Sequence, residues 1–193
     1  MPRTPSLMVP IGTLCPDFDL PDPAGIRHRR ETCRRPNGLL VMFLCNHCPF
    51  VHHVAEEIAR IAADAESRGI GVVGIMSNDF TSHPDDAPDR MTEAATAWKW
   101  RFPYLVDEDQ SAATAFRATC TPDFFLHDGA GRLVYRGQLD GSRPGNGIPV
   151  TGEDLRNAMA AVAEGRAPVE PQQPSLGCNI KWRPDRVPSH ADA

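Results

Sequence analysis

The chain has 193 residues, and its 20 Lys and Arg against 25 Asp and Glu leave a formal net charge of −5 at pH 7. This balance argues against a nucleic-acid-binding protein, which would carry a basic excess. The longest apolar run, Gly38 to Cys45, is far shorter than the ~20 residues of a membrane-spanning helix. The N-terminus shows no apolar leader. We therefore expect a cytoplasmic protein with no membrane or nucleic-acid partner.

The first half of the chain predicts strands and a helix in alternation. Residues 11–20 suit an edge strand or a hairpin. The continuous apolar run over 38–45 is typical of a strand buried on both faces. Pro49 suits the first turn of a helix, which Gly69 ends after several turns of apolar residues at helical spacing. Residues 70–76 form a second apolar run and predict a second buried strand.

The second half predicts a shorter set of elements. These are helices over 89–100, 111–117 and 153–164, and strands over 104–107, 124–127 and 132–138. An Asp-Gly turn joins the last two strands into a hairpin. The order predicts an α/β fold, a three-layer α/β/α sandwich with a mixed sheet and an N-terminal extension. We expect one domain over 1–193 with its core at about 11–165, and an irregular Pro-rich tail over 166–193.

Chemistry is expected at cysteine, because spaced cysteines in a reducing compartment are more often catalytic or metal-binding than cross-linked. Cys45-Asn46-His47-Cys48-Pro49 joins the predicted buried strand to the following helix. The free N–H groups and positive dipole of a helix start favour thiolate and lower a cysteine pKa. A two-residue spacer brings both sulfurs within bonding distance, and a protonated His47 adds positive charge. The motif predicts a dithiol/disulfide pair; the alternative is two buried structural cysteines.

A second motif makes a resemblance specific. Cys120-Thr121-Pro122 precedes the strand at 124–127, and strand, CxxC, helix, Thr-Pro, strand, Asp-Gly turn and strand in this order resemble the thioredoxin fold. The resemblance implies a thioredoxin-like fold with Cys45 and Cys48 as the redox pair and Pro122 in a cis peptide bond facing them. It also implies that Asn46, His47, Pro49, Thr121 and Pro122 line or support a substrate groove.

Three further stretches narrow the resemblance. Residues 12–22, 135–138 and 177–182 are similar to the peroxiredoxin-like branch of the thioredoxin-family redoxins, which includes proteins of the alkyl hydroperoxide reductase and thiol-specific antioxidant type. The resemblance spans about residues 11–182. It implies antioxidant thiol chemistry at a redox-active centre without naming a substrate.

The chain departs from peroxiredoxins at the peroxide-binding residues. Peroxiredoxins carry Pro-x-x-x-Thr-x-x-Cys around the reactive thiol. Alignment on Cys48 puts Cys45 in place of the threonine and Val41 in place of the proline. Residues 118–128, where the partner arginine belongs, contain no arginine. We therefore expect weak peroxidase activity.

The roles of the individual thiols stay open. Thioredoxin-like chemistry makes Cys45 the nucleophile and Cys48 the resolving thiol, whereas peroxiredoxin-like chemistry oxidises Cys48. We favour Cys45, since attack on a disulfide needs only a thiolate and access. Cys120 is either a third redox thiol or a small buried residue. Cys178 either resolves an oxidised Cys48 or is structural, and the structural role is favoured.

The leading hypothesis is a thiol-disulfide oxidoreductase that acts on a protein or small-molecule disulfide with an unidentified electron donor. It needs no cofactor beyond the redox-active Cys45–Cys48 disulfide. A thiol-dependent peroxidase with Cys48 as the oxidised thiol is the first alternative. The second is a copper or zinc carrier that uses Cys45, Cys48 and a histidine. We expect no metal, since a closed zinc site usually takes four ligands and no second ligand pair is present. Oligomeric state is not indicated.

Overall fold

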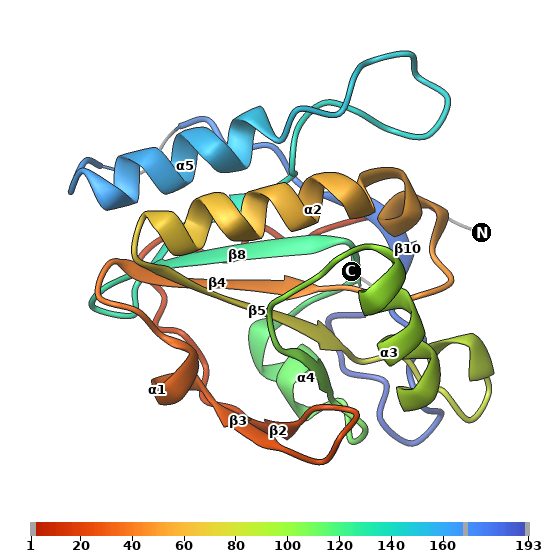
Figure 1. The fold of residues 1–193 in the computed structure, drawn as a ribbon. Helices are drawn as coiled ribbons and strands as arrows, with labels where there is room; N and C mark the ends of the chain where they lie inside the picture. The colour runs from red at the N-terminus through yellow and green to blue at the C-terminus, as the bar shows by residue number, and fades with distance from the viewer. Residues whose placement is uncertain (1–2, 168–169, 192–193) are drawn as a thin grey trace.

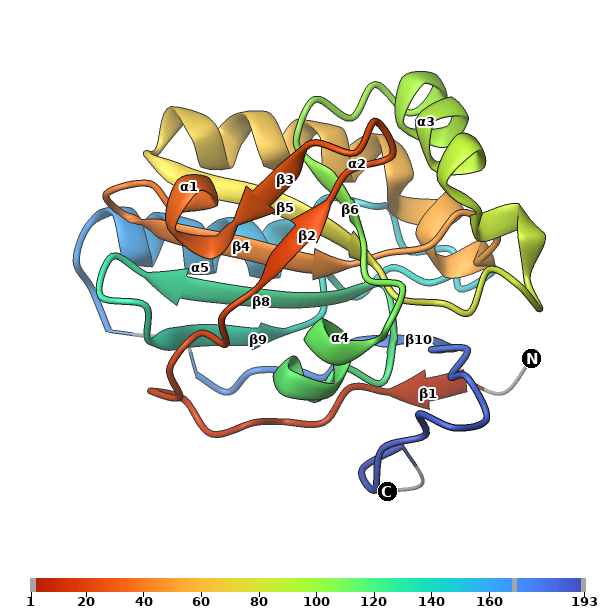
Figure 2. The same ribbon diagram turned by 90° about the horizontal axis from the view of Figure 1, so that it is seen from below.

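The computed structural model describes residues 3–167 and 170–191. A mixed sheet runs through the middle of the molecule (Figure 1), and its strand order, β6-β5-β4-β8-β9, can be followed in Figure 2. Its strands are β4 (Gly38–Phe43), β5 (Ile70–Met76), β6 (Tyr104–Val106), β8 (Asp123–Asp128) and β9 (Leu133–Gly137). β5 and β6 are parallel, whereas β8 is antiparallel to both β4 and β9. Helices α2 (Pro49–Ser67) and α5 (Glu153–Ala163) cover one face, and α4 (Ser111–Phe116) lies on the other.

The sheet is buried on both faces, as the apolar run at 38–45 predicts. Successive side chains of a strand point to opposite faces. Leu40 and Met42 accordingly pack in the cluster under α2 and α5, whereas Leu39, Val41 and Phe43 pack in a second cluster on the other face. The α/β/α layers and the thioredoxin-like fold expected from the sequence are therefore present.

Most of the predicted elements lie where the sequence places them. The helix predicted after Pro49 is α2, and the strand predicted over 70–76 is β5 (Ile70–Met76). Helix α3 (Pro88–Ala97) lies close to its predicted range, and it contacts β6 at the edge of the sheet. None of the described helices is long and apolar enough to cross a membrane.

The N-terminal prediction was wrong in detail. Residues 11–18 form no strand and contribute one isolated bridge, Leu14 to Arg132. The strand begins later, as β2 (Asp19–Pro21), which pairs with β3 (Arg27–Arg29) before the short helix α1 (Arg30–Cys33). Pro16 lacks a backbone N–H and cannot donate to a ladder, which is one reason why this stretch stays irregular.

The Pro-rich tail is not wholly irregular, and this is the main correction to the sequence-based fold. Residues Leu176–Asn179 form β10, which lies between β1 (Arg3–Pro5) and β7 (Cys120–Thr121) and is antiparallel to both (Figure 2). Cys178 stands opposite Thr121 in this ladder. No local pattern predicts β10, because the strands that pair with it, β1 and β7, lie far away in the chain.

Gly177 allows this close approach. A Cβ atom at Gly177 would lie 2.0 Å from the carbonyl oxygen of Thr121 and 3.2 Å from the nitrogen of Pro122. Both neighbours are backbone atoms, so no side chain can turn away to make room. The strand contact therefore depends on glycine at this position.

We expect Gly177→Ala to push β10 away from β7 and to lower the free energy of unfolding by about 1–3 kcal/mol, the usual cost of overpacking. Urea unfolding followed by circular dichroism measures it. Gly141→Ala is the matched control, because the nearest neighbour of its added Cβ would be Ile148 at 4.0 Å. Equal stability of the two variants would contradict the packing argument.

Candidate active site

The CxxC motif occupies the loop between β4 and α2. Cys48 is the N-cap residue of α2, and Pro49 follows in the first turn, where its missing N–H is no loss. Cys45 and Cys48 are both fully buried. Cys45 was favoured as the nucleophile on the ground of access, but it precedes the helix and lies inside the core, so that ground was wrong.

The sulfur of Cys48 lies at the centre of a thiol cluster. It is 2.7 Å from the Cys178 sulfur, about 0.7 Å longer than a disulfide bond. It is also 3.2 Å from the Thr121 carbonyl oxygen. The Cys45 thiol also forms a hydrogen bond with Cys48. The Cys45 sulfur lies 3.1 Å from the Thr121 hydroxyl. The structure thus brings together Cys45, Cys48 and Thr121, as the sequence predicts, and adds Cys178.

The surroundings of the three thiols shift their pKa values in different directions. Hydrogen bonds from the thiols of Cys178 and Cys45 lower the pKa of Cys48, and the N–H of Val51 in the first turn of α2 adds to them. Burial raises the pKa of Cys45, and the Cys48 thiolate raises the pKa of Cys178. The Thr121 carbonyl accepts from a protonated Cys48 and so opposes the thiolate, but the thiol donors outweigh it. These directions favour Cys48, not Cys45, as the thiolate.

Asp86 anchors the loop that carries the motif. It ends the short 3₁₀ helix η1 (Pro84–Asp86) and is fully buried. Its Oδ1 accepts from the backbone N–H of Asn46 at 2.7 Å and of His47 at 3.3 Å. Its Oδ2 lies 2.6 Å from His47 Nδ1 and accepts from Asn78 Nδ2 at 2.8 Å. Sequence reasoning missed Asp86, because an acidic residue in a polar, Pro-rich loop looks like a solvated one.

The Asp86 carboxylate also sets the charge of His47. The hydrogen bond to Asp86 raises the pKa of His47, so the imidazolium persists to higher pH than in an isolated histidine. The His47 ring stacks on His83 with centroids 5.5 Å apart, and its Nε2 has no hydrogen-bond partner among the described residues. The hydrogen bond to Asp86 therefore favours the protonated form of His47 beside the thiols.

Asn46 supports the loop from inside. Its side-chain amide donates to the Asp85 carbonyl at 3.0 Å, and its amide oxygen accepts from the Tyr104 hydroxyl at 3.1 Å. The ring of His52 contacts the Asn46 carbonyl. Asn46 therefore serves as scaffold and does not line an open groove.

The Thr121–Pro122 peptide bond is cis, which confirms the sequence-based expectation. The groove expected beside it is different, however. Thr121 is buried and pairs with Cys178 of β10. The backbone edge on which an extended substrate was expected to bind is thus occupied by the tail of the same chain.

Cys120 forms no hydrogen bond with another thiol in the part of the chain that the structure describes. It is fully buried, and its sulfur is 3.7 Å from the Pro122 carbonyl oxygen. Burial raises its pKa well above the ordinary value. Its surroundings favour the small buried residue over a third redox thiol.

The metal-carrier hypothesis can be tested against the donor set. Cys45, His47 and Asp86 offer ligand atoms that all lie within 4.8 Å of one another. However, both oxygens of Asp86 already accept hydrogen bonds from the loop, from His47 and from Asn78. A metal ion would have to displace these donors, so the arrangement favours a hydrogen-bonded network over a metal centre.

Solved structures of similar proteins cover nearly the whole chain. An uncharacterized conserved protein from Geobacillus kaustophilus is 48% identical, with a TM-score of 0.93 over 95% of this chain and 98% of that one. A hypothetical protein from Sinorhizobium meliloti is 45% identical, with a TM-score of 0.92 over 94% and 99% of the two chains. A secreted disulfide oxidoreductase from Mycobacterium tuberculosis is 16% identical and shares the fold, with a TM-score of 0.58 over 75% of this chain and 95% of that one. No curated protein sequence matches.

The family comparison agrees with the thiol cluster. Residues 11–136 match the AhpC/TSA family, and this range includes the CxxC motif and cis-Pro122. The redoxin chemistry of that family is oxidation and reduction at cysteine. The protein is therefore a member of the AhpC/TSA family, a thioredoxin-like oxidoreductase with thiol redox chemistry.

Proposed function

We propose that the protein is a thiol-disulfide oxidoreductase in which Cys48 is the nucleophile and Cys45 the resolving thiol. The observation that carries the proposal is the position of the Cys48 sulfur, at the start of α2 and in contact with a second thiol at 2.7 Å. The nucleophile in disulfide exchange is the thiolate, and the surrounding donors stabilise that form at Cys48.

The reaction moves two electrons from the protein to the substrate. The Cys48 thiolate attacks one sulfur of the substrate disulfide, and the other half leaves as a thiolate. Cys45 then loses its proton and attacks the Cys48 sulfur of the mixed disulfide, which expels the second half. The products are the Cys45–Cys48 disulfide and two reduced thiols. A second thiol donor, itself oxidised to a disulfide, restores the dithiol.

His47 and Asp86 support this sequence of steps. The hydrogen bond to Asp86 raises the pKa of His47 and so favours the imidazolium. The imidazolium can pass its proton to a leaving thiolate. Asp86 also binds the N–H groups of Asn46 and His47, which holds both cysteines at a constant separation. We assign Asp86 the role of a positioning residue.

A thiol-dependent peroxidase is the second candidate, because Cys178 at 2.7 Å would be a ready resolving partner for an oxidised Cys48. The surroundings of the sulfur speak against efficient peroxide activation. Thr121 contacts Cys45 with its hydroxyl, and Arg136 is fully buried 3.7 Å from Asp123. Neither residue is placed as the threonine and arginine of a peroxiredoxin would be.

We expect Cys48→Ser to reduce the rate of disulfide reduction to the buffer background, because the thiolate is lost. Cys45→Ser combined with Cys178→Ala, in contrast, completes the first attack and stops at the mixed disulfide, because neither neighbouring thiol is left to resolve it. Intact-mass spectrometry after mixing each variant with a small disulfide distinguishes these states. An adduct on Cys45 in the Cys48→Ser variant would make Cys45 the nucleophile and overturn the assignment.

The rate at which Cys48 attacks the disulfide is expected to reach its plateau below pH 8 and to change little with pH above that point. An ordinary thiol with a pKa of about 8.5 loses tenfold in thiolate for each pH unit below that value, whereas the lowered pKa of Cys48 keeps it ionised. Cys178→Ala removes the strongest donor to Cys48 and should move the inflection to higher pH. Stopped-flow rates between pH 5 and 9 check this. A parent profile that rises tenfold per unit up to pH 8.5 would show that Cys48 is not activated.

Peroxide is expected to be a poor substrate. Under equal concentrations, reduced protein should consume hydrogen peroxide at least about 100-fold more slowly than a small disulfide, since the donors that polarise the peroxide bond are missing. Loss of thiols is counted by mass spectrometry for both oxidants. A faster reaction with peroxide would establish the second candidate in place of the first.

A further inference from the structure

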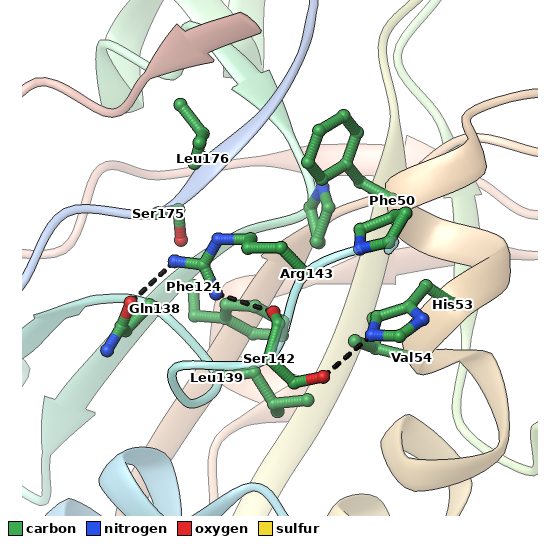
Figure 3. Close-up of a pocket in the computed structure, with 12 residues that line it drawn as sticks. Phe50, His53, Val54, Phe124, Gln138, Leu139, Ser142, Arg143, Ser175 and Leu176 are labelled. Atoms are coloured by element: carbon green, nitrogen blue, oxygen red, sulfur yellow. Dashed lines mark hydrogen bonds between the residues drawn. The ribbon is translucent and has the colours of Figure 1, made fainter. Parts of the chain in front are cut away.

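A small hollow lies between the first part of α2, cis-Pro122, the loop after β9 and the start of β10 (Figure 3). Three of its lining residues are Phe50, Pro122 and Leu176. Each is within two positions of a residue that forms the thiol cluster: Phe50 follows Cys48, Pro122 follows Thr121, and Leu176 precedes Cys178 in β10. The hollow is therefore next to the place where a substrate sulfur must meet Cys48.

The size of the hollow limits what can enter. Its free volume is about 20 Å³, and a single water molecule needs roughly 10–15 Å³ measured in this way. One small polar group fits, whereas a whole side chain does not. Since Cys45, Cys48 and Cys178 are at most 2% exposed, a small disulfide can approach them more readily than the surface of a folded protein can.

A guanidinium group forms one wall of the hollow. Arg143, in the loop after β9, donates to the backbone oxygens of Asp140 at 2.6 Å and Ser142 at 2.7 Å, and also to the side-chain oxygen of Gln138. All these acceptors are neutral. Among the described residues no carboxylate lies within ion-pair distance of Arg143.

The acidic groups nearest to Arg143 are engaged elsewhere. The Asp140 carboxylate accepts from the backbone N–H groups of Ser142, Thr151 and Gly152. The Asp154 carboxylate accepts from Gln138 Nε2 at 2.7 Å. Burial is the largest influence on Arg143 and lowers its pKa, so its positive charge is under-solvated and would be stabilised by an incoming anion.

The loop that carries Arg143 is tied to the helix of the active site. The Ser142 hydroxyl donates to the Ile148 carbonyl at 2.6 Å, so its oxygen must accept from His53 Nε2, 2.7 Å away on α2. Figure 3 shows the hydrogen bonds that link His53 to Ser142 and Ser142 to Arg143. The guanidinium is thus held in a constant position relative to the start of α2.

We infer that this hollow is a binding site for a carboxylate of the substrate, with Arg143 as its cationic partner, and that the substrate class is a low-molecular-mass disulfide carrying a carboxylate near its sulfur. This assignment rests on the proposed disulfide chemistry. Arginine recognises carboxylates through paired, charge-assisted hydrogen bonds. Arg143 is a specificity residue in this scheme and takes no part in the exchange of electrons.

The test compares oxidised glutathione with its tetraethyl ester, in which the same four carboxylates are capped and uncharged. Stopped-flow rates with the reduced full-length protein give a selectivity ratio of acid over ester. We expect Arg143→Gln to lower this ratio at least about tenfold, the effect of one charge-assisted hydrogen bond. Arg143→Lys should lower it less, because the positive charge remains although the paired geometry is lost. Added salt should lower the parent's ratio, because it screens the ion pair.

Arg90→Gln is the matched control, because Arg90 lies on α3, exposed and paired with Glu93 at 2.8 Å. The acid-to-ester rate ratio of the Arg90→Gln variant should equal that of the parent. An unchanged ratio in Arg143→Gln, or an equal fall in Arg90→Gln, would overturn the carboxylate site. Circular dichroism confirms that each variant is folded, and Arg143→Lys keeps the test valid if the glutamine variant is not.

A binding measurement separates this inference from the proposed function. Calorimetry with S-methylglutathione and its diethyl ester, neither of which can exchange sulfur, reports the site without catalysis. Preferential binding of the acid that Arg143→Gln abolishes supports the site even if the parent reduces neither disulfide. Equal binding of acid and ester would overturn the site, whereas failure to reduce either disulfide would overturn the proposed function alone.

Discussion

The pairing of β10 with β7 is the contact on which the active site depends. It places Cys178 opposite Thr121, brings the Cys178 sulfur to 2.7 Å from Cys48 and covers the backbone edge beside cis-Pro122. A thiol pair that would stand at an open groove is thereby enclosed. The same contact leaves a small hollow between the start of α2, cis-Pro122 and β10, and this becomes the approach for a substrate group.

The thiols of the cluster differ because their surroundings differ. Cys48 lies at the helix N-cap and receives hydrogen bonds that lower its pKa, whereas burial raises the pKa of Cys45 and the hydrogen bond with Cys48 raises the pKa of Cys178. Ionisation of all three thiols at once would be costly, because the negative charges would repel one another in a buried volume. The hydrogen-bonded His47–Asp86 pair lies beside the cluster, and this pairing raises the pKa of His47.

Much of the fold and the heart of the site could be predicted from local patterns. Patterns of only a few residues predicted four features: the strand β4, the helix start at Pro49, the CxxC spacing and the Thr-Pro before β8. Cis-Pro122 was predicted by resemblance and is confirmed. What the local patterns missed were Asp86, which looked like a loop residue, and the burial of Cys45, which a motif alone does not show.

The sequence by itself determined the layered α/β/α architecture, the position of the cysteine pair before α2 and the class of chemistry, because apolar periodicity and short motifs act between neighbouring residues. Only the tertiary structure decided that the tail forms β10, that Cys178 contacts Cys48 and that Arg143 faces a hollow beside the thiols. These features come from segments far apart in the chain, and their pairing depends on steric fit and hydrogen bonding across the fold. Gly177 is an example: this position excludes a side chain because the backbone of Thr121 lies against it, a contact that exists only in the folded chain.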